Sequence, residues 1–168
     1  MGMSVPEGRV VVVGGGAAGM MASIFAGKAG ARVTLLERGE KLGKKVYITG
    51  KGRCNVTNDC STAELLKHIT GGHKFLYSAF SRFSPQDTMQ FFESLGVPLK
   101  TERGNRVFPV SDRATDIVMA MRQNLSDLGV YVVQERAARL SVLEGAMRGV
   151  CTDQRGFPCA AVIVASGC

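Results

Sequence analysis

The sequence predicts an α/β domain that combines a parallel sheet with an antiparallel β-meander. Residues 10–13 form an uninterrupted apolar run, which is typical of a parallel strand buried on both faces. Residues 33–37 repeat this pattern after a helical stretch, so a strand–helix–strand unit is predicted. Three further strands, at 137–143, 148–152 and 157–164, are separated by short turns, and short turns predict antiparallel pairing.

Length and composition fit one domain with an ordinary core. The chain has 168 residues, of which 45% are apolar and 21% charged. Its five cysteines, without a secretory signal, predict free thiols rather than a disulfide framework. The uncharged stretch 10–27 contains five glycines, and a strand, a turn and a helix explain it better than a membrane span or a signal peptide. We therefore expect a cytoplasmic protein with no membrane partner.

The first strand runs into a glycine turn with the spacing G-x-G-x-x-G, followed by an alanine-rich helix at 17–29. Gly14 permits the tight turn, Gly16 leaves no Cβ between the backbone and a phosphate, and Gly19 lets the helix pack close to the strand. The free N–H groups at the helix start, around Ala17 and Ala18, would face a pyrophosphate. The turn therefore predicts a Rossmann-like site for an ADP moiety.

The second strand ends in Glu37, eighteen residues after Gly19. This spacing is typical of a carboxylate that binds the adenosine ribose hydroxyls; a surface acid at a strand end is the alternative. Arg38 could accept a 2′-phosphate that Glu37 would repel, and together they favour a ribose without that phosphate. The glycine turn itself establishes only an ADP moiety, which FAD, NAD and NADP share.

Most of the net charge of +7 lies in one loop. Residues 38–53 hold six Lys and Arg side chains against one acid, which is five of the seven surplus charges. Because this loop directly follows the second strand, a loop that faces an anionic cofactor is favoured over a solvated basic loop. The charge is not spread over a face, so no nucleic-acid partner is predicted.

The middle of the chain predicts helices and a hairpin. Ser61 and Glu64 form a capping box at the start of a helix that ends near residue 69. The other predicted elements are a helix at 84–96 with Ser84 as its N-cap, a hairpin formed by 99–103 and 106–110, a helix at 113–128 capped by Asp112, and a strand at 130–133. The side chains predicted to be core on the first helix and on the helix at 84–96 are Met20, Met21, Ile24, Phe25, Met89, Phe92 and Leu95.

Residues 49–58, TGKGRCNVTN, combine two glycines, two cations, a thiol and two asparagines. The two glycines allow unusual dihedrals and close backbone approach, while Arg53 and Asn55 supply donors for phosphate, ribityl or ring oxygens. Cys54 is interpreted as a small residue packed beside a cofactor; a thiol with a lowered pKa is the alternative. With Cys60 and His68 it fits no common zinc pattern, so no metal site is predicted.

With this loop the sequence resembles the aminoacetone-oxidase-like family of bacterial NAD(P)/FAD-dependent oxidoreductases. The resemblance rests on GGGAAGMMA, LLE, GKK and TGKGRCNVTN and continues through FFESLGVPLKTERGNRVFPVSDRATDIV to the last residue. It implies that the glycine turn and the strand-end acid hold the ADP half of FAD and that GRCN lies along the cofactor. The family's usual glycine before GRCN is Lys51 here. The residues predicted to bind the cofactor are Gly14, Gly15, Gly16, Ala17, Ala18, Gly19, Glu37, Arg38, Lys45, Gly50, Gly52, Arg53, Cys54, Asn55, Ala138, Ser166 and Gly167.

The family generally reads Ala-Thr-Gly-Gly where this chain ends with Ala165-Ser166-Gly167-Cys168. Family members carry inserted domains and a closing FAD segment after this point. The resemblance therefore implies that residues 1–168 are the N-terminal part of an FAD-binding domain, present as a fragment or a short form.

The leading hypothesis is an FAD-dependent oxidoreductase in which hydride passes between a small organic substrate and the flavin, with O₂ or NAD(P)H as the second partner. Two alternatives stay open: a non-catalytic module that binds ADP or a dinucleotide, and an NAD(P)-binding enzyme. No catalytic residue is predicted, because no Ser/His/Asp arrangement or carboxylate pair is evident. The sequence leaves the oligomeric state open.

Overall fold

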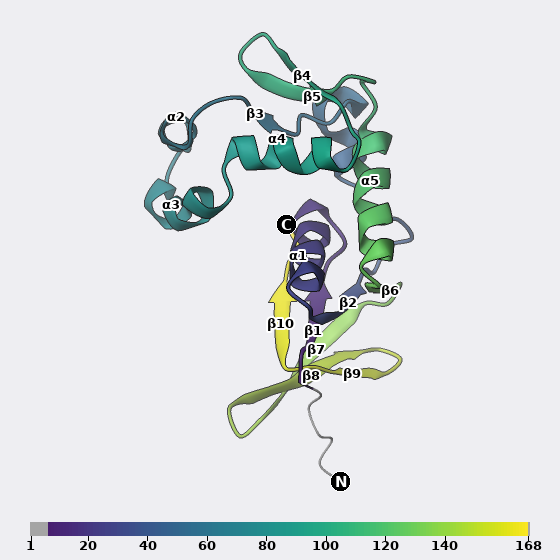
Figure 1. Cartoon of the computed structure of the whole chain (residues 1–168). Helices are drawn as coiled ribbons and strands as arrows, with labels where there is room; N and C mark the ends of the chain where they lie inside the picture. The colour runs from purple at the N-terminus through teal and green to yellow at the C-terminus, as the bar shows by residue number, and fades with distance from the viewer. Residues whose placement is uncertain (1–6, 168) are drawn as a thin grey trace. The chain divides into compact units, whose positions relative to one another are not determined.

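The computed structural model describes residues 7–167, which form two compact units (Figure 1). The first unit takes its described residues from 7–46 and 121–167, and the second unit consists of Tyr47–Ala120. Cys168, where a second family glycine was expected, lies outside the described residues. No helix among residues 7–167 is long and apolar enough to cross a membrane.

A parallel sheet of four strands forms the centre of the first unit (Figure 1). Its strands are β1 (Arg9–Val13), β2 (Arg32–Leu36), β6 (Tyr131–Val133) and β10 (Ala161–Val164), in the order β10-β1-β2-β6. All three pairings are parallel, as expected for strands joined through crossovers. The predicted Rossmann-like α/β fold is therefore confirmed.

Helix α1 (Ala17–Lys28) connects β1 to β2 and packs on this sheet. Met20 and Ile24 on the helix are fully buried, as are Val11 and Val12 in the central strand. Met21 is only half-buried, and Phe25 is 43% exposed, so the prediction that Phe25 is core is wrong. Residues spaced by four lie on the same face of a helix, so Met20 and Ile24 face the sheet together. Met21 and Phe25, one position further along, lie on an adjacent and more exposed face.

The predicted β-meander is also present. Strands β7 (Ala137–Leu143), β8 (Ala146–Thr152) and β9 (Gly156–Pro158) pair antiparallel in this order. The single strand predicted at 157–164 is wrong, because it is two strands in two different sheets. The chain leaves the meander at Cys159, which is completely buried, and continues as β10 beside β1.

The second unit contains a smaller antiparallel sheet, and helix α4 (Pro85–Ser94) contacts two of its strands. The sheet has the strand order β3-β5-β4. Its elements, with the two that cross its boundaries, are η1 (Val46–Gly52), β3 (Thr57–Asn58), α2 (Thr62–Lys67), α3 (His73–Arg82), α4 (Pro85–Ser94), β4 (Leu99–Glu102), β5 (Arg106–Pro109) and α5 (Ala114–Asp127). The predicted hairpin is confirmed as β4 and β5, and its unpredicted partner strand is β3.

Helix starts in the second unit were predicted with mixed success. Ser84 caps α4 as expected and forms a reciprocal capping box with Asp87. Helix α5 begins at Ala114, one residue later than predicted, and the carboxylate of its predicted cap, Asp112, forms ion pairs with Arg53 and Lys100. Met89 and Leu95 are half-buried rather than core. Helix α3, on which Phe75 and Tyr77 are exposed, was not predicted.

Candidate functional site

The glycine turn of the first unit has the geometry that its spacing predicts. Gly14 has a φ of +106°, and a Cβ there would lie 2.5 Å from the Ala165 carbonyl oxygen. Its N–H donates to the Leu36 carbonyl at 2.8 Å, which ties the turn to the end of β2. A Cβ on Gly19 would overlap the Gly14 carbonyl oxygen. Both positions therefore require glycine for the chain itself to fold.

Gly16 is different, because the chain itself gives no reason for a glycine there. Its φ of −73° and ψ of −175° suit any residue. A Cβ at this position would meet no atom within 4 Å. The absence of a side chain at Gly16 thus leaves a space that no protein atom fills, as expected of a pyrophosphate-binding turn.

The start of α1 presents free backbone donors beside this space. The α-helical ladder begins with the Met20 N–H, which donates to the Gly16 carbonyl at 2.9 Å. The amides of Ala17, Ala18 and Gly19 precede it and have no acceptor within the helix. Ala17 and Ala18 are exposed, and Gly16 provides no side-chain cap. This end of the helix is therefore electropositive and accessible to an anion.

Glu37 joins the glycine turn to the loop that follows β2. Its Oε2 accepts a hydrogen bond from the Gly15 N–H at 2.6 Å, and its Oε1 accepts one from the Gly39 N–H at 2.7 Å. A Cβ on Gly15 would overlap the Leu42 side chain and approach the carboxylate to 3.0 Å. The carboxylate is thus fixed in place, and its remaining lone pairs can still accept from sugar hydroxyls.

A cavity of about 370 Å³ in the first unit lies at the carboxyl ends of the parallel strands. This edge is where open α/β sheets bind ligands. Six of the predicted cofactor residues line it: Gly14, Glu37, Arg38, Lys45, Ser166 and Gly167. The wall formed by Glu135, Arg136 and Ala137 completes it.

Ala138, one of the residues predicted to bind the cofactor, is not among the residues that line this cavity. Ala137, rather than Ala138, lines the cavity. Ala138 lies at a register shift between β7 and β8, because the pairing passes from Ala137 directly to Arg139. Such an irregularity re-aims the backbone and is not visible in the sequence.

Sequence reasoning missed Glu135, which anchors this wall. Thr152 Oγ1 donates to Glu135 Oε2 at 2.7 Å, while Arg155 approaches Oε1 with Nε at 3.0 Å and Nη2 at 2.8 Å. The bonds connect the end of β6 to the β8–β9 turn. They lower the pKa of the Glu135 carboxyl below its ordinary value, the Thr152 hydrogen bond most of all. A buried acid directly after an apolar strand was the only available signal.

We expect Glu135→Gln to lower stability at neutral pH and to have less effect in acid. Because the folded-state pKa is lowered, the carboxylate stabilises the fold above its unfolded pKa of about 4.3. That contribution is lost as the pH falls through the folded pKa. Urea unfolding of both proteins between about pH 7 and pH 3 should show the difference shrinking. A difference that does not change with pH would contradict the assigned ionisation.

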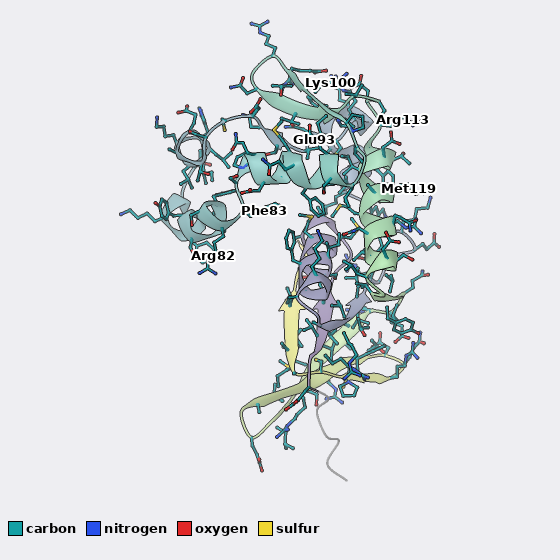
Figure 2. The ribbon with its side chains drawn as sticks, in the orientation of Figure 1. Arg82, Phe83, Glu93, Lys100, Arg113 and Met119 are labelled. Atoms are coloured by element: carbon teal, nitrogen blue, oxygen red, sulfur yellow. The ribbon has the colours of Figure 1, made fainter. Side chains whose placement is uncertain are left out.

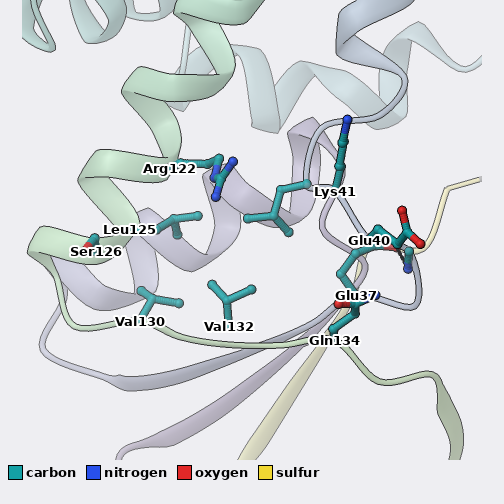
Figure 3. A pocket seen from close by; sticks show the side chains of 11 residues that line it. Glu37, Glu40, Lys41, Arg122, Leu125, Ser126, Val130, Val132 and Gln134 are labelled. Carbon is teal, nitrogen blue, oxygen red and sulfur yellow. Dashed lines mark hydrogen bonds between the residues drawn. The ribbon is translucent and has the colours of Figure 1, made fainter.

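A second cavity, of about 360 Å³, adjoins Glu37 on the side of α5 (Figure 3). Its apolar lining consists of Leu42, Leu125, Val130 and Val132. The charged side chain of Lys41 lies on the opposite side. Glu37 therefore lines both cavities, and of the two only the first is also lined by Gly14, Ser166 and Gly167.

The loop at 49–58 belongs to the second unit and is tightly bent. Gly50, Lys51, Gly52 and Cys54 all have positive φ, between +55° and +87°. A Cβ on Gly50 would lie 2.9 Å from the Asn55 N–H nitrogen. The predicted unusual dihedrals are confirmed, and they extend to two residues that are not glycine.

The polar groups of this loop have partners within the second unit. Arg53 forms ion pairs with Glu102 and Asp112. With its amide oriented so that the nitrogen faces the neighbouring carbonyls, the Asn55 side chain donates to Thr57 at 3.0 Å and to Val107 at 3.2 Å. Contact of these side chains with a cofactor stays a prediction.

Cys54 is a packed thiol rather than an activated one. It is only 6% exposed, and burial raises its pKa above the ordinary value. A lowered thiol pKa is therefore wrong, and packing is the interpretation that the structure supports. Cys54, Cys60, Cys151 and Cys159 are free thiols. The described part of the chain brings no three potential metal ligands together.

Lys51→Gly is expected to stabilise the second unit by about 0.5–1 kcal/mol. A left-handed backbone costs a residue with a Cβ about 1–2 kcal/mol, and the larger entropy of an unfolded glycine offsets part of the gain. Thermal or urea unfolding would measure the change. Lys44→Gly, at an exposed position without positive φ, is the control and should not stabilise.

Comparison with known proteins gives one family and several relatives. The family model described as "HI0933-like protein Rossmann domain" matches residues 8–168. A 3-dehydro-bile acid delta(4,6)-reductase of Clostridium scindens is 34% identical, with 95% of this chain and 39% of the relative covered. A ribosomal RNA dihydrouridine synthase of Escherichia coli is 30% identical, with 94% and 38% covered. The chain thus spans about two fifths of the length of these curated relatives.

Solved structures share the fold at lower identity. A 3-ketosteroid-delta4-(5alpha)-dehydrogenase from Rhodococcus jostii has a TM-score of 0.69 at 20% identity, with 98% of this chain and 47% of that chain covered. THI4 from Thermovibrio ammonificans has a TM-score of 0.61 at 17% identity, with 95% and 58% covered. At these identities the likeness establishes the fold alone.

Proposed function

The chain belongs to the HI0933-like protein family, and from this premise we propose that it binds FAD as the cofactor-binding part of a flavin-dependent oxidoreductase. The observation that supports this most directly is the space beside Gly16: neither the backbone conformation nor the packing of the protein requires a glycine at this position. The names of the relatives, a reductase and a dihydrouridine synthase, agree with redox chemistry.

The residues present fit the ADP half of FAD. The amides at the start of α1, around Gly16 to Ala18, would hold the pyrophosphate. Glu37 would accept hydrogen bonds from the ribose hydroxyls. Arg38 and Lys45 add positive charge to the cavity. A bound flavin would supply hydride transfer, and the protein would position it and exclude water.

The substrate of the whole protein is proposed to be a small organic molecule, with NAD(P)H as a second substrate. A reductase named for a bile acid, 34% identical to the chain, supports the first part. The free thiols of the described cysteines agree with a cytoplasmic location.

The experiment that tests this proposal is an absorption spectrum of the purified protein, followed by titration with FAD. A flavin band, or quenching of flavin fluorescence on titration, is expected. A colourless protein that takes up no added FAD would overturn the proposal. Parallel titrations with ADP and NADH decide the alternatives: equal affinity for ADP and FAD indicates an ADP-binding module, and binding of NADH alone indicates an NAD(P)-dependent enzyme.

A further inference from the structure

Arg53, which its sequence context marks as a cofactor ligand, lies in a network of charges within the second unit. Its Nη2 is 2.7 Å from Glu102 Oε2, and its Nε is 3.0 Å from Asp112 Oδ1. Lys100 joins the same two carboxylates, with Nζ 3.5 Å from Glu102 Oε1 and 2.7 Å from Asp112 Oδ2. Two cations and two carboxylates therefore compensate each other.

The guanidinium of Arg53 is also held against an aromatic ring. Its central carbon lies 4.0 Å from the centroid of Phe108, a distance typical of a cation–π contact. Phe108 is 4% exposed and belongs to β5, so the platform is rigid. The same ring limits Gly50, since a Cβ there would lie 3.0 Å from Phe108 Cε1.

The loop that carries Arg53 needs such support. Four of its residues, Gly50, Lys51, Gly52 and Cys54, have positive φ, and two of these are not glycine. Backbone in this region costs about 1 kcal/mol or more per residue with a Cβ, and it persists only where surrounding contacts determine it. Arg53 connects this strained segment to Glu102 on the β4–β5 hairpin and to Asp112, which precedes α5. Figure 2 labels a neighbour of each carboxylate: Lys100 on the hairpin and Arg113 at the start of α5.

We infer that Arg53 is a positioning residue: its pairing with Glu102 and Asp112, over the Phe108 ring, holds the TGKGRCN loop in its left-handed conformation, and the guanidinium is not a phosphate ligand. A phosphate would have to displace two carboxylates at hydrogen-bond distance. The loop's contribution to binding then comes from its backbone, which the glycines leave accessible. Where it concerns FAD, the inference rests on the proposed function. The role of Arg53 in holding the loop does not depend on FAD binding.

The test compares the double variant Glu102→Gln/Asp112→Asn with the wild-type chain. Backbone hydrogen exchange of residues 49–55, measured without FAD, should accelerate about three- to tenfold, because the ion pairs that order the loop are lost. FAD affinity should fall by a similar factor. If Arg53 were instead a phosphate ligand, removing its two carboxylates would free its charge, and FAD affinity would hold or rise.

The control is Glu64→Gln/Asp116→Asn, which removes two carboxylates of the same unit from pairs with Lys67 and Arg113. It should leave the exchange of residues 49–55 unchanged. Unchanged exchange in the Glu102/Asp112 variant, or FAD affinity that is unchanged or higher in it, overturns the inference. Failure of the wild-type chain to bind FAD would instead overturn the proposed function, and the exchange measurement would still decide the role of Arg53.

Discussion

Gly16→Val is expected to weaken FAD binding at least about 100-fold, the equivalent of about 2.7 kcal/mol, while the chain stays folded. The backbone at Gly16 suits any residue, and a Cβ there would meet no protein atom within 4 Å. The added isopropyl group would occupy the space beside the α1 amides where the pyrophosphate is proposed to lie. Fluorescence titration with FAD measures the affinity, and thermal unfolding without FAD checks the fold.

The matched control is Gly156→Val in the meander. Gly156 also has no left-handed backbone, a Cβ added to it would meet no atom within 4 Å, and it lies in β9, in the antiparallel meander rather than in the turn before α1. This variant should bind FAD like the wild-type chain. Equal affinities of the two variants would remove Gly16 from the site. The same substitution at Gly14 or Gly19 would not be informative, because a Cβ there collides with the protein's own backbone.

The parts of the site that could be predicted are those set by local chain geometry. The glycine turn, the start of α1 and Glu37 lie within one strand–helix–strand unit, where spacing determines placement. The parts that could not be predicted depend on distant pairing. The carboxylate partners of Arg53 come from β4 and from the turn before α5, and no residue pattern near TGKGRCN predicts these pairings.

The fold shows the same division between local and distant signals. The hairpin of β4 and β5 follows from its turn residues, whereas its pairing with the two-residue β3 has no periodic signal. The break of 157–164 into β9 and β10 also depends on distant contacts. There the Cys159 N–H donates a hydrogen bond to the Arg148 carbonyl in β8, and the Ala160 N–H donates one to the Arg9 carbonyl in β1. Consecutive residues therefore pair with different sheets.

Glu37→Gln is the second large expected effect, because it changes an acceptor that serves two donors. Both carboxylate oxygens accept a backbone N–H, from Gly15 and from Gly39. A glutamine offers one acceptor oxygen, so its NH₂ group must face one of these two N–H groups. A hydrogen bond to a charged group contributes about 1.5–3 kcal/mol. The loss should destabilise the first unit and weaken FAD binding about 10- to 100-fold.

Glu40→Gln is the control, because it removes a negative charge from the same loop without changing the hydrogen bonds of Glu37. Glu40 is exposed, lies in the same loop and loses the same charge on substitution. If the general negative potential near the cavity mattered, both variants would bind FAD alike, and both would bind it more tightly because the pyrophosphate is an anion. The hydrogen-bonded carboxylate of Glu37 predicts the opposite: weaker binding in Glu37→Gln alone. FAD titrations of the two variants at low and high salt decide this, since screening removes only the general effect.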